Sequence, residues 1–515
     1  MKLDSILIVG GGSSGWMTAA TLIKKFPNKK ITLIESPNVP IIGVGESTIG
    51  GIKYWTKWLG INDKQFLKHT DGSYKLSIKF TDFYKKGEYF HYPFGKPFLK
   101  ENLNHLNDWW YKKFLYIDTK NNDYADCYYP QMALVNENKC FYNEKNELPF
   151  NFESDTAYHF DATKFGLWLK ENYCIPKGVN YINENIETIE QDENGIVSLN
   201  KKYKADLYID CTGFKSLLLG ETLKEPFESY TDLLPNNSAW ATRIPYKNKE
   251  KELVTYTNCT AIENGWVWNI PLWSRIGTGY VYSDKFVSDE NALKEFQNHL
   301  GTDNLEFKKI KMKIGIHKRL FVKNVVAIGL SAGFIEPLES SGLFTVHEFL
   351  MNLIRNIDRE KISQWDKDNF TYQCKHLFKN FSEFVALHYA LSHRNDTDYW
   401  KNNFKKNWEE KLINLNPTTI NGMFTIAYNR NFLYKFDNSM GEGSHCIAAG
   451  MNWSPTNLDT ILYLNQKDIN YFENLWQPFI NNLEERKNNW KKIVKEKTSL
   501  FKFLKDNIYN ENSIN

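Results

Sequence analysis

The sequence predicts an α/β fold, α+β overall, in which a Rossmann-like domain is joined to a mostly helical second domain. A short apolar run at residues 5–9 leads through a glycine-rich turn into a helix-compatible stretch. Similar apolar runs recur later in the chain, and from about Gly342 onward the pattern becomes helical. The length of 515 residues exceeds what one hydrophobic core usually organises, so we expect two closely joined domains.

The predicted parallel sheet begins with a βαβ unit. The strand at residues 5–9 is followed by a helix over Trp16–Phe26 and a second strand over Ile31–Glu35. The apolar runs Ala205–Cys211 and Val325–Leu330 have the composition of buried strands, and both precede turns that contain glycine. We therefore expect one domain to be assembled from segments that are far apart in the chain.

A second sheet is expected between residues 239 and 283, where polar and apolar residues alternate. The predicted domain division follows from these patterns. It assigns residues 1–85, 150–235 and 310–355 to the discontinuous nucleotide-binding domain, 236–309 to a β-sheet region packed on it, and 86–149 and 356–515 to a mostly helical substrate-binding domain.

Composition excludes several classes of protein. The 64 basic and 61 acidic side chains are scattered and leave a net charge of +3, which is too weak a field to predict nucleic-acid binding. There is no apolar run long enough to cross a bilayer, and no signal peptide is expected. The seven cysteines lack CxxC spacing, so we expect no disulfide framework, no metal site, and a cytoplasmic location.

A GxGxxG motif lies directly between the first strand and the first helix. Its first glycine permits a tight turn, its second lets a pyrophosphate approach the backbone, and its third allows helix and strand to pack closely. Glu35 ends the next strand, where it can accept hydrogen bonds from a ribose. This motif predicts a dinucleotide but does not separate NAD from FAD. A second glycine-containing stretch, Val325–Gly342, favours FAD because it can bring backbone N–H groups to the flavin end.

Four strings, in this order, give the sequence a family resemblance. They are GVGESTIG at Gly43–Gly50, AYHFDATKF at Ala157–Phe165, GWVWNIP at Gly265–Pro271 and PLESSG at Pro337–Gly342. The sequence resembles the flavin-dependent tryptophan halogenases and their relatives as far as about Met451, and this implies an FAD-binding domain of the flavin monooxygenase type. The expected cofactor-binding residues are Gly10, Gly12, Ser13, Gly15, Glu35, Gly45, Glu46, Ser47, Gly329, Gly333 and Pro337.

The resemblance implies two catalytic residues. Lys75 stands at the position of the family's active-site lysine, and Glu339 aligns with its glutamate. Alternate residues over 74–80 are apolar, so a strand there projects Lys75 either onto the polar face with Lys79 or into a tunnel.

The implied reaction uses reduced FAD, O₂ and a halide, which is chloride, bromide or iodide, to form hypohalous acid. The halide is expected at Ser341 and Gly342, which match the family's halide site. Lys75 then directs the oxidant to the substrate, through a hydrogen bond or a haloamine. No second dinucleotide fingerprint is found, so a separate NADH-dependent flavin reductase is expected to supply FADH₂.

An indole, a phenol or another small electron-rich aromatic is the expected substrate. Phe94, Tyr92, Trp266 and Trp268 are candidate substrate-binding residues, whereas His445 stands where many relatives have an aromatic residue. The acidic and aromatic cluster that holds free tryptophan is not found there. Two alternatives stay open, an aromatic hydroxylase that uses the same flavin and a non-catalytic flavin-binding protein. Assembly into a homo-oligomer is left open.

Overall fold

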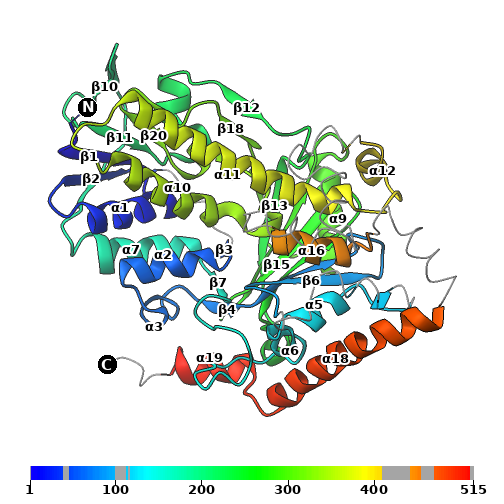
Figure 1. Ribbon diagram of the computed structural model, residues 1–515. Helices are drawn as coiled ribbons and strands as arrows, with labels where there is room; N and C mark the ends of the chain where they lie inside the picture. The colour runs from blue at the N-terminus through cyan, green and yellow to red at the C-terminus, as the bar shows by residue number, and fades with distance from the viewer. Residues whose placement is uncertain are drawn as a thin grey trace.

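The computed structural model describes residues 2–38, 46–98, 109, 112–113, 116, 118–406, 408, 441–453 and 469–510. Its architecture places one mostly parallel sheet with flanking helices beside a larger mixed sheet, with the C-terminal helices along the far edge (Figure 1). Among the described residues, no helix is both long and apolar enough to span a membrane.

The first sheet has six strands in the order β19-β20-β11-β1-β2-β8. Its strands are β1 (Ser5–Val9), β2 (Lys30–Glu35), β8 (Asn180–Asn183), β11 (Leu207–Asp210), β19 (Phe321–Val322) and β20 (Val325–Ala327). All neighbours pair in parallel except β19 and β20. The sheet therefore combines chain segments more than three hundred residues apart, as the apolar runs predict.

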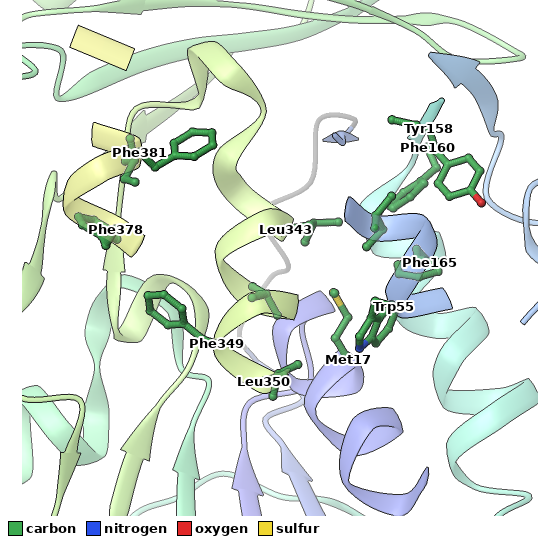
Figure 2. Close-up of a cluster of buried hydrophobic side chains, with 14 of the residues drawn as sticks. Met17, Trp55, Tyr158, Phe160, Phe165, Leu343, Phe349, Leu350, Phe378 and Phe381 are labelled. Atoms are coloured by element: carbon green, nitrogen blue, oxygen red, sulfur yellow. The ribbon is translucent and has the colours of Figure 1, made fainter. Parts of the chain in front are cut away.

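Helices α1 (Ser13–Lys25), α7 (Ala162–Leu169), α10 (Ser341–Ile357) and α11 (Gln364–Ala390) pack beside this sheet (Figure 1). Figure 2 shows the buried core where α1, α10 and α2 (Gly51–Leu59) meet, with Met17, Trp55, Leu343 and Leu350 pointing toward one another. Burying each such side chain contributes roughly 1.5–3 kcal/mol to folding. This core fixes the beginning of α10.

The second sheet has seven strands in the order β17-β13-β16-β15-β14-β5-β6. Its strands are β5 (Ser77–Thr81), β6 (Tyr89–Pro93), β13 (Ser238–Ile244), β14 (Tyr256–Ala261), β15 (Gly265–Pro271), β16 (Ile276–Tyr282) and β17 (Lys308–Lys311). The sheet is wider than the region 236–309 expected from the sequence, because it also takes β5 and β6 from residues 77–93. The domain division itself stays a prediction.

A third, small sheet leads along the chain into the seven-stranded one. It contains β3 (Glu46–Ser47), β7 (Ala157–Phe160) and β4 (Ser73–Lys75), in that order. The chain leaves this sheet at Leu76 and enters the seven-stranded sheet at Ser77. At this junction, the N–H of Leu76 donates to the carbonyl of Thr255, and the carbonyl of Leu76 accepts from the N–H of Phe94. Lys75 and Lys79 therefore belong to different sheets. Of the two alternatives for Lys75, the polar strand face shared with Lys79 is wrong.

The remaining strands form two peripheral sheets, and the remaining helices connect or cover the others. The strands are β9 (Ile189–Asp192), β10 (Gly195–Leu199), β12 (Phe227–Ser229), β18 (Gly315–His317) and β21 (Gly333–Phe334). The helices are α3 (Asp63–Phe66), α5 (Asp123–Tyr128), α6 (Gln131–Asn136), α8 (Lys249–Glu252), α9 (Asp289–Leu300), α12 (Asp398–Phe404), α16 (Gly441–Gly450), α18 (Ile469–Lys495) and α19 (Leu500–Asn507).

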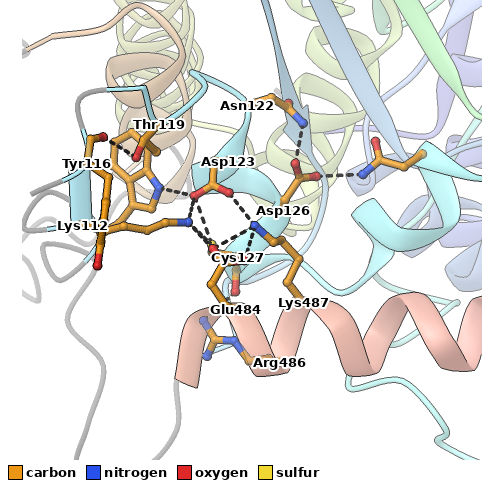
Figure 3. A network of polar contacts seen from close by, with 12 residues as sticks. Lys112, Tyr116, Thr119, Asn122, Asp123, Asp126, Cys127, Glu484, Arg486 and Lys487 are labelled. Carbon is orange, nitrogen blue, oxygen red and sulfur yellow. Dashed lines mark hydrogen bonds and ion pairs between the residues drawn. The ribbon is translucent and has the colours of Figure 1, made fainter. Parts of the chain in front are cut away.

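The long C-terminal helix α18 packs against α5 and α6, and a network of charged side chains links it to α5 (Figure 3). Asp123 accepts from Lys112 and, at 2.7 Å, from Lys487, and it also accepts from the indole N–H of Trp109 at 3.0 Å. Burial raises the pKa of Asp123, but the two ammonium groups outweigh it and lower the pKa to about 2. The carboxylate is therefore charged at neutral pH.

Asp123→Asn should loosen α18, because the change removes the carboxylate shared by Lys112 and Lys487. Breaking a buried ion pair costs roughly 3–5 kcal/mol, and partial exposure reduces that figure here. We expect faster hydrogen exchange over residues 480–495 and unchanged exchange in α1, measured by mass spectrometry. Asp398→Asn, at an exposed carboxylate, is the control, and equal exchange in both variants would contradict the docking role.

Candidate active site

A cavity of about 670 Å³ runs along the carboxyl ends of the parallel strands toward the seven-stranded sheet. Its lining at one end includes Gly10, Gly12 and Glu35, and at the other Trp266 and Trp268. Further expected cofactor-binding residues also line it, namely Ser13, Glu46, Ser47, Gly329, Gly333 and Pro337. Gly45 lies outside the described residues. The arrangement suits an extended dinucleotide, because such ligands bind outside the carboxyl ends of strands.

The glycine-rich turn has the geometry that a pyrophosphate needs. Gly10 has φ +114° and donates its N–H to Ile34 at 2.9 Å. A Cβ atom on Gly15 would lie 1.8 Å from the carbonyl oxygen of Gly10, whereas one on Gly12 would meet nothing within 4 Å. Gly15 thus permits close helix packing, and Gly12 leaves open space at the start of α1. The residues present fit the phosphates of a dinucleotide.

Two other expected contacts have partners within the protein. The Ser13 hydroxyl donates to the carbonyl of Ala162 at 2.9 Å, and Lys170 lies 3.5 Å from the Glu35 carboxylate. Burial, together with nearby Asp161, raises the pKa of Glu46 to about 7.

Lys75 is fully buried at the end of β4. Its ammonium group donates to the carbonyl of Thr48 at 3.0 Å and to the Ser340 hydroxyl at 2.8 Å, and it lies 4.9 Å from the centre of the Phe94 ring. Burial lowers the pKa of Lys75 to about 7, although nearby Glu339 and Cys259 raise it. Both the ammonium and the amine form are therefore accessible near neutral pH.

A chain of hydroxyl groups connects Lys75 with the cofactor cavity. Ser340 donates to Ser47 at 3.0 Å, and the Ser47 and Thr257 hydroxyl oxygens are 2.6 Å apart. Thr257 in turn lies 2.8 Å from Nε2 of His159. Ser47, Thr257 and Ser340 line the cavity, whereas Lys75 is not among its lining residues. Polar side chains thus separate the lysine from the cavity and also link the two.

Glu339 lies close to Lys75, at the end of a 3₁₀ turn formed by Pro337–Glu339. Its side chain is 1% exposed, and its Oε1 atom is 3.0 Å from Nε2 of His388 on α11. The next residue, Ser340, has φ +59° and precedes α10. This turn brings the carboxylate and the Ser340 hydroxyl to the same buried place as Lys75.

Ser341 and Gly342, the expected halide site, are the first two residues of α10. Gly342 lines the cavity, while the Ser341 hydroxyl donates to Ile335 at 3.2 Å. The first backbone N–H groups of a helix lack partners within it and carry partial positive charge, so this position suits an anion. Its role in binding halide stays a prediction.

The two tryptophans of the GWVWNIP string lie on β15 and line the cavity. Their ring centres are 6.2 Å apart. The indole N–H of Trp266 donates to Glu336 at 3.0 Å, and the Tyr389 hydroxyl donates to the same carboxylate oxygen. Burial raises the pKa of Glu336 to about 7. Trp266 is therefore held in one orientation by a buried carboxyl group.

The other candidate substrate-binding residues lie around Phe94. The Tyr92 and Phe94 ring centres are 6.2 Å apart, and Tyr92 also packs against Phe384 of α11. His445 is buried in α16, which contacts β6, and burial lowers its pKa to about 3. The structure thus brings Phe94 next to Lys75, whereas His445 belongs to a helix that covers the same sheet edge.

Comparison with known proteins identifies the family. A family model described as tryptophan halogenase matches residues 5–460. The chain is 31% identical over 492 residues to the tryptophan 6-halogenase ThaL of Streptomyces albogriseolus, covering 88% of this chain and 91% of that protein. It is 30% identical over 485 residues to the tryptophan 7-halogenase RebH of Lentzea aerocolonigenes, covering 88% and 90%. The chain belongs to the tryptophan halogenase family.

Solved structures agree with this assignment. The VirX1 apo structure is 38% identical with a TM-score of 0.88, and the match covers 99% of both chains. BrvH, a flavin-dependent halogenase from Brevundimonas sp. BAL3, is 28% identical with a TM-score of 0.82 over 98% of this chain and 99% of that one. The protein is a flavin-dependent halogenase that uses FAD and a halide. The fold class, family and enzyme class expected from the sequence are confirmed.

Several residues of the halogenase site were missed by sequence reasoning. Thr48 and Ser340 lie in the matched strings, but their contacts with Lys75 have no local signal. Glu336 lies next to PLESSG and could have been noticed as a carboxyl group in an apolar run. His388 and Tyr389 are part of an ordinary helical pattern, so only the folded chain reveals them.

Two glycine variants should separate folding from cofactor binding in this halogenase. Gly15→Ala should prevent folding, because the new Cβ would overlap the Gly10 carbonyl. Gly12→Ala should fold normally, because its Cβ enters open space, but should weaken FAD binding at least tenfold, or by about 1.4 kcal/mol. Thermal melting and flavin fluorescence titration measure the two effects. Unchanged FAD affinity in Gly12→Ala would place the cofactor elsewhere.

Lys75 should also give the halogenase a pH-dependent stability. Because its pKa falls from 10.5 in the unfolded chain to about 7 in the folded one, the unfolded state binds more protons between these values. The stability penalty is full at and below pH 7 and disappears as the pH rises toward 10.5. We expect the stability advantage of Lys75→Met over wild type to shrink from about pH 7 to about pH 9 in denaturant titrations. Lys177→Met, at an exposed lysine, should show no such trend.

Proposed function

We propose that this halogenase uses O₂ and chloride, bromide or iodide to halogenate an indole, a phenol or another small electron-rich aromatic. The observation that carries the proposal is Lys75, whose buried ammonium group has one N–H left for a ligand. Lysine has three donors, and Thr48 and Ser340 take two of them. The third can hold the oxygen of hypohalous acid and so make the halogen more electrophilic.

Reduced FAD supplies two electrons when bound, so that FADH₂, O₂, X⁻ and H⁺ yield FAD, HOX and H₂O. The chain's own residues bind and separate the reactants. The first turn of α10 is the proposed halide site, and Trp266 and Trp268 form the cavity wall that keeps the substrate from the flavin. This separation suppresses direct hydroxylation of the substrate and argues against the alternative of an aromatic hydroxylase.

Glu339 is the second proposed catalytic residue. Its carboxyl group is buried close to Lys75, and the Phe94 ring faces the same ammonium group. An aromatic substrate beside Phe94 would have its ring within reach of both side chains. Glu339 would stabilise the positive charge that develops on the ring and take up the ring proton. Halogenation is then balanced as ArH + HOX → ArX + H₂O.

The partners follow from the same chemistry. A separate NADH-dependent flavin reductase would supply FADH₂, because the chain carries one dinucleotide fingerprint. A cytoplasmic location is supported by the seven cysteines, which are all buried free thiols. The relatives ThaL and RebH are tryptophan halogenases by name, and an indole is the substrate ring that this likeness favours.

Product analysis tests this function directly. A reaction with FAD, NADH, a flavin reductase, bromide and a panel of indoles and phenols should give brominated product by mass spectrometry. Lys75→Ala should reduce the yield at least a hundredfold while FAD binding is unchanged, because general catalysis by a positioned group contributes roughly 10²–10⁴-fold. Lys177→Ala is the matched surface control. Oxygenated product without halogen would instead assign the protein to the hydroxylases.

A further inference from the structure

His388 lies beside Glu339, the proposed catalytic carboxylate. It lies near the end of α11, 49 residues beyond Glu339 in the chain, and both side chains are at most 1% exposed. Nε2 of the imidazole is 3.0 Å from Oε1 of Glu339, although the contact is not aligned as a straight hydrogen bond. His388 lies outside the four strings that carry the family resemblance.

The contact of Nδ1, the other ring nitrogen of His388, determines the tautomer of the imidazole. Nδ1 of His388 lies 3.1 Å from the carbonyl oxygen of Val385, and a carbonyl oxygen only accepts, so Nδ1 carries a hydrogen. A neutral ring of this tautomer presents a lone pair at Nε2. Two lone pairs 3.0 Å apart in a buried site would repel each other, so a proton on either Nε2 or Oε1 is what makes this close approach favourable.

The surroundings of the pair are apolar on the histidine side. The ring centre of His388 lies 4.4 Å from that of Phe80 and within 6.4 Å of those of Phe83, Phe90 and Phe384. Lys75 is close enough to Glu339 for the carboxylate to raise the pKa of the lysine. Because this environment excludes water, the proton can move between the imidazole and the carboxyl group but not readily to solvent.

We propose that His388 and Glu339 share one proton and that His388 is the positioning residue through which Glu339 acts as acid and base in halogenation. The proposal rests on the proposed function. As the ring carbon forms its bond to halogen and the X–O bond breaks, Glu339 gives its proton to the departing oxygen, which leaves as water. Glu339 then takes up the proton that leaves the substrate ring and shares it with His388. The protonation of the Glu339–His388 pair is thereby restored.

Tyr389, the next residue of α11, also positions a carboxyl group of the site. Tyr389 donates to Glu336, which also accepts from Trp266, so two consecutive residues of α11 hold the two carboxyl groups of one loop. The end of α11 therefore sets the positions of both the tryptophan at the cavity wall and the glutamate beside Lys75.

Two variants of His388 distinguish proton sharing from simple positioning. His388→Gln keeps an N–H that can reach Glu339 but cannot exchange a proton, and His388→Phe keeps the ring shape without a donor. His376→Gln makes the same change on the exposed side of the same helix and is the matched control. Thermal melting and flavin fluorescence titration establish that each variant folds and binds FAD.

In the bromination assay, we expect kcat to fall at least tenfold in His388→Gln and His388→Phe, with KM for the aromatic substrate within about twofold of wild type. The kcat of wild type should be the same with ordinary substrate and with substrate deuterated at the reacting carbon, each measured separately. The kcat of the variants should be lower with the deuterated substrate, because transfer of the ring proton becomes slow. Wild-type kcat and no isotope effect on it in His388→Gln would overturn proton sharing. Failure of wild type to halogenate would instead overturn the proposed function.

A measurement without turnover keeps the inference testable if a variant does not fold. In ¹⁵N-histidine-labelled wild-type protein, the His388 resonances should show a protonated Nδ1 and an Nε2 whose shift changes in Glu339→Gln. An Nε2 resonance that is insensitive to Glu339→Gln would show that no proton is shared, and this result would contradict the proposal independently of activity.

Discussion

The burial of the Lys75 ammonium group is the constraint on which the site depends. A buried ammonium is stable only where oxygen atoms replace its water, and these atoms come from two separate segments, the Thr48 carbonyl and the Ser340 hydroxyl. Ser340 adopts φ +59°, which costs roughly 1 kcal/mol for a residue other than glycine. Two hydrogen bonds of its hydroxyl offset this strain, since the hydroxyl accepts from Lys75 and donates to Ser47. Three segments must therefore meet around one side chain.

The loop before α10 is held from both ends. Packing of Leu343 and Leu350 against the core fixes the beginning of α10, and the end of α11 reaches the two carboxyl groups of the loop. Consecutive residues of a helix point about 100° apart, so His388 and Tyr389 can hold two groups that face different directions. One contact lies beside Lys75 and the other supports Trp266. Small shifts of α11 would thus affect the cavity wall and the lysine together.

Local sequence patterns predicted the parts of the fold that depend on local chemistry. The strand, turn and helix at the N-terminus were recognisable because glycine spacing and apolar runs act over a few residues. The break between strands after Lys75 was not recognisable from the sequence. Apolar residues alternate without interruption over 74–80, although β4 pairs with β7 and β5 pairs with β14. His388 shows the same limit, since a histidine within an apolar helix usually belongs to the core and its partner is distant in sequence.

In the proposed reaction, formation of the oxidant and halogenation of the substrate take place in two separate parts of the structure. Trp266 and Trp268 line the cavity that fits the dinucleotide, and Lys75 and Glu339 lie outside its lining. Ser340 belongs to both environments, because it lines the cavity and accepts from Lys75. In the proposed reaction, a small neutral molecule such as hypohalous acid can pass along this polar boundary, whereas an aromatic ring cannot. The identity of the halogenated carbon is then decided on the lysine side, by how the substrate ring lies against Phe94, Lys75 and Glu339.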